Sequence, residues 1–348
     1  MPNKTMKAVG FYNYFPIEHP ESLLDITLNK PVAVGSDLLV RVKAVSVNPV
    51  DVIVRAPKDI VEDKPKIVGW DVAGVVEQTG PDCKIFKPGD EVYYAGSYIR
   101  DGGNSEFHLV DERIVGKKPA SLGYAEAAAL PLTTITAWEA LFDRMGIPTD
   151  TERNRGKSLL IIGAAGGVGS IAIQLAKWAG LTVIGTASRP ESSEWILRMG
   201  ADHTINHRQP LLPQLQSMEH EHVHYIFNLN STDVYWNQMV ETIAPQGKIC
   251  GIVDASGPVD LTQLKFKSAT FVWEMMFTRP IFQTEDQIEQ HKLLNRVAEM
   301  VDAGILQTTL TKRLEPINAM TMRRAHAIVE SGSSIGKVVV EHFPVLNA

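Results

Sequence analysis

The second half of the chain alternates between short apolar segments and longer amphipathic segments, and this constrains the fold more than any other feature. Strands that are joined by helices pair in parallel, because each connection has to cross the sheet. The helices then cover both faces. We therefore predict a doubly wound parallel α/β sheet. Its predicted strands are 158–162, 181–186, 223–229 and 248–253, and its predicted helices are 167–179, 190–199 and 234–243.

The first part of the chain shows a different pattern. Residues 38–44 alternate with the period of a half-buried strand, and 69–76 form an apolar run that contains two glycines. A turn over 87–90 precedes another strand at 91–94. Short strands with turn signals between them indicate a partly open β-barrel. Helices are expected over 125–130, 133–142, 286–303 and 319–330, with a last strand at 337–341.

The length of 348 residues predicts about two domains at roughly 150 residues each. We place a β-rich substrate domain at 1–128 and 304–348. The nucleotide-binding domain is placed at 129–303. The change of pattern near Ala125 and the return to strand at the end of the chain set these boundaries.

The bulk composition excludes several kinds of partner. A net charge of -6 argues against a nucleic-acid surface, which needs a basic patch. No uncharged apolar run approaches the roughly 18 residues of a membrane span. Cys83 and Cys250 are the only cysteines, which fits a reducing compartment. We expect a cytoplasmic protein that acts on a small molecule.

A glycine-rich loop stands between the first strand and the first helix of the alternating region. Glycines allow a tight turn and let the backbone approach a pyrophosphate, which the N–H groups of a helix N-terminus attract. The motif departs from G-x-G-x-x-G at Ala165, and the alternative is a loop needed only for packing. The cofactor site is expected to include Gly163, Ala165, Gly166, Gly167, Val168 and Gly169.

The segment after the next strand bears on the choice of cofactor. An NAD site usually places Asp or Glu about 20 residues beyond the glycines, where it accepts from the ribose 2′-OH. Here the strand is followed by Ala187-Ser188-Arg189-Pro190, without a carboxylate. Arg189 can hold a 2′-phosphate, Ser188 can donate another bond, and Lys177 adds positive charge. This favours NADPH over NADH; alternatively, Arg189 is a solvated residue at a helix start.

Several motifs together resemble the medium-chain dehydrogenase/reductase superfamily, over nearly the whole chain. The resemblance implies a Rossmann nucleotide domain joined to a GroES-like, partly open β-barrel. It points to the quinone oxidoreductase branch, and 271–290 resembles the subgroup often labelled zinc-type alcohol dehydrogenase-like. It also implies a homodimer formed through the nucleotide domain. The motifs are Val47-Asn48-Pro49-Val50-Asp51, Val68-Gly69-Trp70-Asp71-Val72-Ala73-Gly74-Val75-Val76, Lys87-Pro88-Gly89-Asp90-Glu91-Val92, Leu130-Pro131-Leu132-Thr133-Thr134 and Gly336-Lys337-Val338-Val339.

The zinc label does not agree with the residues. Zinc alcohol dehydrogenases of this superfamily have Cys at the position of Asn48 and a His-Glu pair at the position of Trp70-Asp71. Zinc prefers sulfur and nitrogen ligands in a tetrahedral array, and an indole cannot ligate it. A structural zinc lobe needs four closely spaced cysteines, and this chain has two in all. The expected metal content is therefore none.

Without zinc, hydrogen-bond donors must stabilise the oxygen that gains charge when hydride reaches the substrate. Asn48 is the first candidate, because its amide can donate; the alternative is a turn residue before Pro49. Asp51 is expected to orient partners. Tyr93 or Tyr94 can supply a phenol, although at most one of them faces the cleft, since neighbouring strand residues point opposite ways. Either tyrosine is about equally a core residue.

Other candidates follow from their positions. Thr133 opens a helix, where its hydroxyl caps the helix or touches the nicotinamide carboxamide. Asn228 follows the carboxyl end of a parallel strand, where ligands bind in such sheets. Apolar side chains are expected to line a pocket for a flat or alkyl-chain substrate, or to form a subunit contact. They are Trp70, Trp273 and Phe277.

These features predict an NADPH-dependent oxidoreductase that transfers hydride to a quinone or an α,β-unsaturated carbonyl compound. Two alternatives stay open: a zinc-dependent alcohol dehydrogenase-like enzyme with a rearranged site, and an NADPH-binding protein without turnover. A separate metal site is weighed at three alternating histidines, for which a solvated loop is the favoured interpretation. These are His220, His222 and His224.

Overall fold

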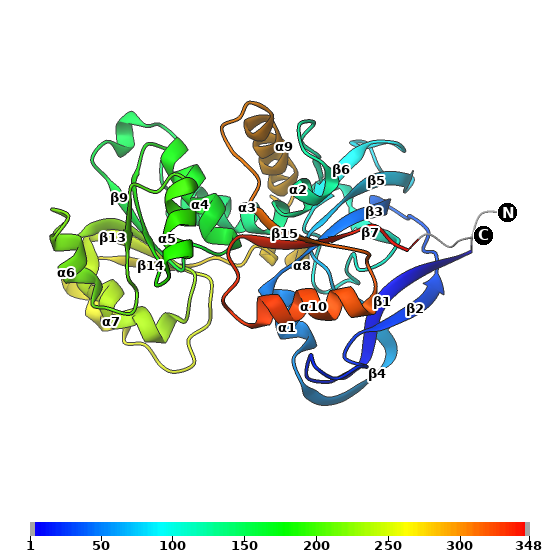
Figure 1. The fold of residues 1–348 in the computed structure, drawn as a ribbon. Helices are drawn as coiled ribbons and strands as arrows, with labels where there is room; N and C mark the ends of the chain where they lie inside the picture. The colour runs from blue at the N-terminus through cyan, green and yellow to red at the C-terminus, as the bar shows by residue number, and fades with distance from the viewer. Residues whose placement is uncertain (1–3, 345–348) are drawn as a thin grey trace. The chain divides into compact units, whose positions relative to one another are not determined.

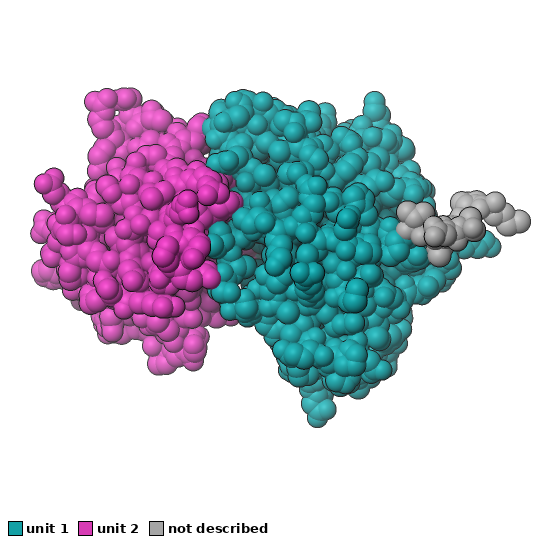
Figure 2. All heavy atoms as spheres, viewed as in Figure 1, with its two compact units in different colours: residues 1–132, 277–348 teal, residues 133–276 magenta. Residues whose placement is uncertain are grey.

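The computed structural model describes residues 4–344. The chain forms two compact units (Figure 2): the first comprises 1–132 and 277–348, and the second 133–276. The sequence-based boundaries lay at 128 and 303. The main difference is the helix α9 (Glu289–Asp302), which packs on β8 (Gly116–Lys117) in the first unit. Within the described residues, no helix is both long and apolar enough for a membrane span.

The second unit contains a six-stranded sheet in which every neighbouring pair is parallel (Figure 1). Its order, β11-β10-β9-β12-β13-β14, reverses direction at β9, as in a doubly wound fold. The predicted Rossmann sheet is therefore confirmed. The strands are β9 (Ser158–Ile162), β10 (Thr182–Thr186), β11 (His203–Ile205), β12 (Val223–Asn228), β13 (Ile243–Gly251) and β14 (Thr270–Trp273).

Helices between successive strands supply the rest of this unit. All five residues of β9 are buried, as expected for a central parallel strand. The hydrophobic core includes Leu160, Ile184 and Trp236, which come from two strands and one helix. The predicted helices begin and end within about two residues of the observed ones, the usual uncertainty at helix ends. The observed helices are α4 (Gly167–Trp178), α5 (Pro190–Arg198), α6 (Leu211–Gln216) and α7 (Thr232–Thr242).

The first unit is rich in antiparallel strands, as the GroES-like expectation required. Its seven-stranded sheet runs β15-β16-β3-β5-β6-β8, and β7 also pairs with β3. A second sheet has the order β2-β1-β4. The strands are β1 (Thr5–Tyr14), β2 (Leu24–Asn29), β3 (Asp37–Val47), β4 (Lys58–Lys66), β5 (Val72–Thr79), β6 (Glu91–Tyr94), β7 (Phe107–Asp111), β15 (Leu310–Leu314) and β16 (Lys337–Glu341).

Strand β3 organises this unit because it has three partners. Its first half pairs with β7, its last residues pair with β16, and β5 pairs along most of its length. The short helix α1 (Pro49–Arg55) follows β3 directly and opens after Asn48. The ends of β3, β5 and β16 therefore bring together residues that are distant in sequence.

The helix expected over 133–142 divides into two parts. The α-helical part is α3 (Pro131–Trp138), and Glu139–Arg144 continue it with π-helical hydrogen bonding. Short π segments inside helices occur frequently at functional sites. The other helices of the chain are α2 (Tyr124–Ala128), α8 (Thr278–Phe282) and α10 (Ala319–Glu330).

Candidate cofactor and catalytic sites

The glycine-rich loop joins β9 to α4 at the carboxyl edge of the parallel sheet. Gly163 has a φ of 84°, which favours glycine, and its N–H donates to Oγ1 of Thr186 at 3.0 Å. Helix α4 begins directly after Gly166. The first-turn N–H groups of an α-helix have no acceptor within the helix, so this end suits a phosphate. The loop has the local structure that the sequence predicted.

Close packing explains why glycine is needed at two further positions. A Cβ on Gly169 would lie 2.4 Å from the carbonyl oxygen of Ala164. A Cβ on Gly185 in β10 would lie 2.6 Å from a side-chain carbon of Ile196. By contrast, a Cβ on Gly166 would meet only the carbonyl oxygen of Gly163, at 3.8 Å. Gly169 and Gly185 are thus required for packing, whereas Gly166 leaves open space.

The residues predicted to select the cofactor lie next to this loop in the sheet order. Ser188 and Arg189 follow the carboxyl end of β10, which pairs with β9. Ser188 is partly buried and Arg189 is exposed. Helix α5 begins directly after Arg189, with Pro190 as its first residue.

Lys177 lies elsewhere. Its ammonium contacts both carboxylate oxygens of Asp202, at 2.7 and 2.8 Å. The same carboxylate accepts from the N–H of Val183, near the amino end of β10. Since helix α4 runs antiparallel to the strands, its last turn lies at the edge opposite the glycine loop. We therefore leave Lys177 out of the cofactor site.

Asn228 borders the loop, but its amide serves the local turn. Its Nδ2 donates to the carbonyl oxygen of Asn230 at 2.8 Å and to Oγ1 of Thr232 at 3.2 Å. The next residue, Leu229, donates through its N–H to the carbonyl oxygen of Ile162. Leu229 thus makes the contact beside Gly163, and the Asn228 amide stays within its own turn. Thr133 is buried in the first turn of α3.

In the first unit, Asn48 belongs to a buried polar network. Its side chain is 1% exposed, and its Nδ2 donates to Oδ2 of Asp71 at 3.1 Å and to the carbonyl oxygen of Ser46 at 3.3 Å. Its Oδ1 accepts from Nζ of Lys337. Both amide hydrogens are therefore engaged. A substrate oxygen can receive one only if the longer contact, with Ser46, is given up.

Asp71 and Lys337 form the charged centre of this network. Lys337 Nζ lies 3.2 Å from Oδ2 of Asp71, and both side chains are almost fully enclosed. Oδ1 of Asp71 accepts from the N–H of Leu132 at 3.0 Å. Burial raises the pKa of Asp71 and lowers the pKa of Lys337, and their mutual attraction opposes both shifts. Lys337 was not predicted as the partner of Asp71.

Asp51 supports the same network from helix α1. Its two carboxylate oxygens accept from the N–H groups of Asn48 at 2.7 Å and Gly69 at 2.8 Å. Burial raises the pKa of Asp51 to about 7, although both N–H groups and the charge of Lys337 act against this shift. Asp51 thus orients its neighbours, and its carboxyl group is fully enclosed.

Tyr93 occupies the core. Its side chain is buried and its hydroxyl donates to the carbonyl oxygen of Leu294 at 2.6 Å. Tyr94 is also buried, with its hydroxyl 3.0 Å from Nδ1 of His108. Both phenols therefore have partners within the first unit. Tyr93 therefore has a packing role, and the prediction that its phenol is catalytic is withdrawn because its hydroxyl is already bound.

Two of the three predicted substrate-pocket residues meet through a third aromatic side chain. Trp70 and Phe277 each pack edge-on against Tyr98, with ring centroids 6.4 and 5.2 Å away. Tyr98 is partly exposed, whereas Trp70 and Phe277 are buried. Trp273 belongs to the other unit and is 49% exposed. Tyr98 was not predicted as a site residue, although it follows strand β6 closely.

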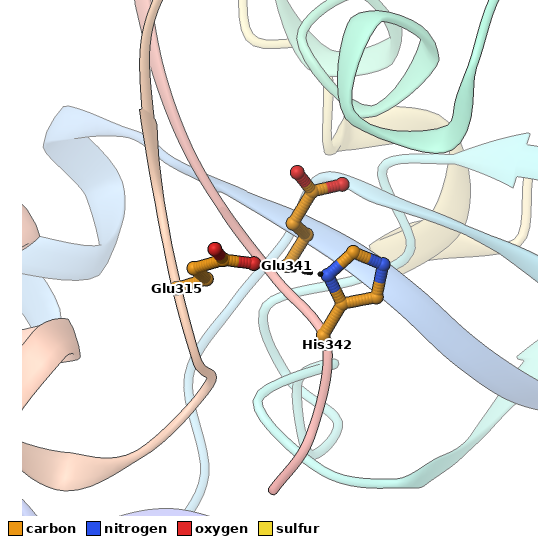
Figure 3. Close-up of side chains that lie close together, drawn as sticks. All are labelled: Glu315, Glu341 and His342. Atoms are coloured by element: carbon orange, nitrogen blue, oxygen red, sulfur yellow. Dashed lines mark hydrogen bonds and ion pairs between the residues drawn. The ribbon is translucent and has the colours of Figure 1, made fainter.

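The three predicted metal-candidate histidines are not brought together. His224 accepts from the N–H of Ser158 through Nδ1 at 3.1 Å, and the ring of His220 lies 6.0 Å from that of His203. Within residues 4–344, one grouping of three potential ligands occurs, in the first unit (Figure 3). It comprises Glu315, Glu341 and His342. Arg313 contacts Glu341 at 3.3 Å, and its positive charge disfavours a metal there.

A second buried acidic site lies in the second unit. Glu139 and Glu274 are both fully enclosed, and Arg144 Nε donates to Oε2 of Glu274 at 2.9 Å. Glu274 directly follows β14. Burial and the neighbouring Glu139 raise the pKa of Glu274 to about 9, against the opposing effect of Arg144. The buried pair of Glu139 and Glu274 therefore favours binding of a proton.

Glu274→Gln is expected to remove a pH dependence of stability. An unfolded Glu has a pKa near 4.3, so between about pH 4 and 9 the folded chain binds a proton that the unfolded chain lacks. This group therefore makes stability fall as pH rises, by up to about 1.4 kcal/mol per pH unit. In urea unfolding from pH 5 to 8, the free energy of unfolding of the variant should rise relative to that of the wild type as the pH increases. Glu299→Gln, at an exposed ion pair with Arg296, is the control. The prediction is contradicted if the stability of Glu274→Gln depends on pH in the same way as that of the wild type.

The fold and the family models define a class: a two-unit oxidoreductase with a doubly wound parallel sheet. Family models agree, with an alcohol dehydrogenase GroES-like domain matching residues 35–138 and a zinc-binding dehydrogenase domain matching 167–290. The chain belongs to the medium-chain dehydrogenase/reductase superfamily, and it shares its fold with quinone oxidoreductases.

Individual relatives cover almost the whole chain. A zinc-type alcohol dehydrogenase-like protein of Staphylococcus aureus is 45% identical over 96% of this chain and 99% of its own length. A crystal structure from Rhizobium etli, of a protein named for zinc-dependent alcohol dehydrogenases, is 51% identical, with a TM-score of 0.93 over 98% of this chain and 99% of that one. A quinone oxidoreductase of Pseudomonas syringae is 25% identical, with a TM-score of 0.80 over 97% and 99%.

The residues present do not fit the zinc in these names. Trp70 offers no ligand atom for a metal. Oδ1 of Asn48 and Oδ2 of Asp71 are both bound by the Lys337 ammonium. A cation would have to displace that ammonium, and it would then find oxygen donors in place of the sulfur and nitrogen that zinc prefers.

Proposed function

We propose that this chain is an NADPH-dependent reductase of quinones or α,β-unsaturated carbonyl compounds that works without zinc. The proposal depends on one observation, made at the edge of the sheet where the glycine loop lies. Beside it, Ser188 and Arg189 stand where an NAD enzyme usually has a carboxylate. In this proposal the first turn of α4 binds the pyrophosphate, and Ser188 and Arg189 bind the 2′-phosphate.

The reaction needs little acid–base chemistry from the protein. NADPH, when bound, supplies hydride from its nicotinamide ring. Addition of hydride and one solvent proton converts a quinone to a hydroquinone, so no dedicated protein acid is required. In this proposal Asn48 stabilises the substrate oxygen by giving up its contact with Ser46. Tyr98 offers the apolar surface for a flat substrate, and the buried rings of Trp70 and Phe277 support it from behind.

The test of the reaction is direct. NADPH oxidation is measured against a quinone, an enone and a simple aldehyde, with a chelator present. Turnover of the quinone or the enone supports the proposal. Turnover that requires added zinc would contradict the zinc-free part. Tight NADPH binding without oxidation of any of the three compounds would contradict the reductase assignment.

We further propose a cytoplasmic homodimer formed through the second unit. Strand β14 ends the sheet order and, among residues 4–344, pairs with β13 alone, which leaves one edge for another chain. The exposed Trp273 lies on this strand. Cys83 and Cys250 are both free thiols, as expected in a reducing compartment. Sedimentation analysis of the purified protein tests the dimer.

Arg189→Ala is expected to weaken the binding of NADPH much more than the binding of NADH. A hydrogen bond to a charged group contributes about 1.5–3 kcal/mol, which corresponds to a loss of roughly tenfold or more in NADPH affinity. NADH lacks the 2′-phosphate and should bind almost as before. Titration by quenching of tryptophan fluorescence measures both affinities. Arg198→Ala, at an exposed position later in α5, is the control; equal losses for both cofactors would remove the argument for NADPH.

A further inference from the structure

Lys337 is a lysine whose charged end is buried. It opens β16, and its side chain is 4% exposed. Burial of an ammonium ion is costly unless charges and hydrogen bonds compensate for it. The burial of this ammonium therefore requires groups around it that compensate for its charge.

The three N–H groups of this ammonium have three acceptors. Nζ lies 3.1 Å from the carbonyl oxygen of Val47 and 3.2 Å from Oδ2 of Asp71, and it also donates to Oδ1 of Asn48. The acceptors come from the end of β3, the residue before α1 and the segment before β5. One cation is thus enclosed by one carboxylate oxygen and two neutral oxygens.

The ammonium also fixes which way the Asn48 amide faces. With Oδ1 toward Lys337, Nδ2 can donate to Asp71. A reversed amide would place N–H groups against the ammonium and its oxygen against the carboxylate. The charges on either side therefore select one orientation of Asn48.

We propose that the Lys337 ammonium is the resident cation of this site, where it takes the place of a metal ion and positions Asn48 and Asp71. It links β3, β5 and β16, and through Asp71 it reaches the N–H of Leu132 in the first turn of α3. This inference rests on the zinc-free part of the proposed function but not on its cofactor or substrate.

The test removes the ammonium and then returns it as a small molecule. Lys337→Ala deletes the side chain from Cγ to Nζ, which corresponds to n-propylammonium. We expect the apparent Tm to fall by roughly 5–10 °C, as for loss of one partner of a buried ion pair. Added n-propylammonium chloride should restore most of this loss. Tetramethylammonium chloride, which is charged but has no N–H donor, should not, and the wild-type Tm should respond to neither salt.

A second variant covers the case in which Lys337→Ala does not fold. Asp71→Asn/Lys337→Met lacks both charges, and we expect it to fold with a higher Tm than Lys337→Met alone. The inference is overturned if Lys337→Ala keeps the wild-type Tm. It is also overturned if the two salts restore its Tm equally or not at all, or if purified wild type holds one equivalent of zinc that Asp71→Asn loses. If the wild type oxidises no NADPH, the proposed function is wrong. Rescue of Lys337→Ala by n-propylammonium would still support the inference about Lys337.

Discussion

Gly169→Ala is expected to destabilise the second unit and to lower NADPH affinity at least tenfold. The new Cβ would lie 2.4 Å from the carbonyl oxygen of Ala164 and 2.6 Å from its carbonyl carbon and Cα. These are backbone atoms in the loop before α4, so they cannot move aside as a flexible side chain would. Overpacking of this kind costs about 1–3 kcal/mol, and sometimes more. Because the loop is expected to hold the pyrophosphate, its displacement should also impair binding.

Gly166→Ala is the matched control in the same loop. Its Cβ would meet no atom closer than 3.8 Å, and its φ of -74° suits any residue. The folded protein should therefore be as stable as the wild type. NADPH affinity should still fall, because the methyl group would stand where the dinucleotide is expected to approach. Thermal unfolding and fluorescence titration of both variants distinguish packing from binding; a stable Gly169→Ala protein with normal NADPH affinity would contradict the geometry of the loop.

Asp71→Ala is expected to cost about 3–5 kcal/mol of stability, since it leaves the buried Lys337 ammonium without its counter-charge. It also removes the acceptor of the Leu132 N–H. Urea unfolding, followed by tryptophan fluorescence, measures the loss. The double variant Asp71→Ala/Lys337→Met should regain part of it, because no unpaired charge is left inside.

Glu152→Ala provides the comparison with an exposed ion pair. Glu152 and Arg155 are 73% and 80% exposed, and such pairs contribute about 0–1 kcal/mol. The prediction for Asp71 fails if Asp71→Ala costs no more than Glu152→Ala. It also fails if the losses from Asp71→Ala and Lys337→Met simply add in the double variant, since additivity would mean that the two charges do not interact.

The fold was largely predictable because its signals are local. The strand at 158–162, the glycine loop and helix α4 were recognised from adjacent residues, and the order of strands and helices implied the parallel sheet. Several strands were not predicted. Two of them are long: β1 has ten residues, and β4 has nine, most of which are exposed and give no apolar period. Two others are short: β11 has three residues and β14 has four. Short segments give too few residues for a periodic pattern to stand out.

The sites were less predictable because they depend on contacts between distant segments. Asn48 and Asp51 were recognised from one motif, but their partner Lys337 is almost 300 residues away in sequence. The wrong prediction for Tyr93 has the same reason, because its hydroxyl donates to the carbonyl oxygen of Leu294, a residue distant in sequence. Lys177 was wrongly assigned to the cofactor site because the length of α4 was not considered. A residue in the last turn of α4 lies at the opposite edge of the sheet from the first turn.

The boundary between the two units falls inside helix α3, between Leu132 and Thr133. A fragment that contained only the second unit would start within a helix, without the first-turn residues that Asp71 anchors. The backbone N–H groups of Ile135 and Thr136 would lose their acceptors, the carbonyl oxygens of Pro131 and Leu132 four residues earlier. Dissection of this chain into separately expressed halves should therefore place the cut before Pro131, so that the helix stays whole.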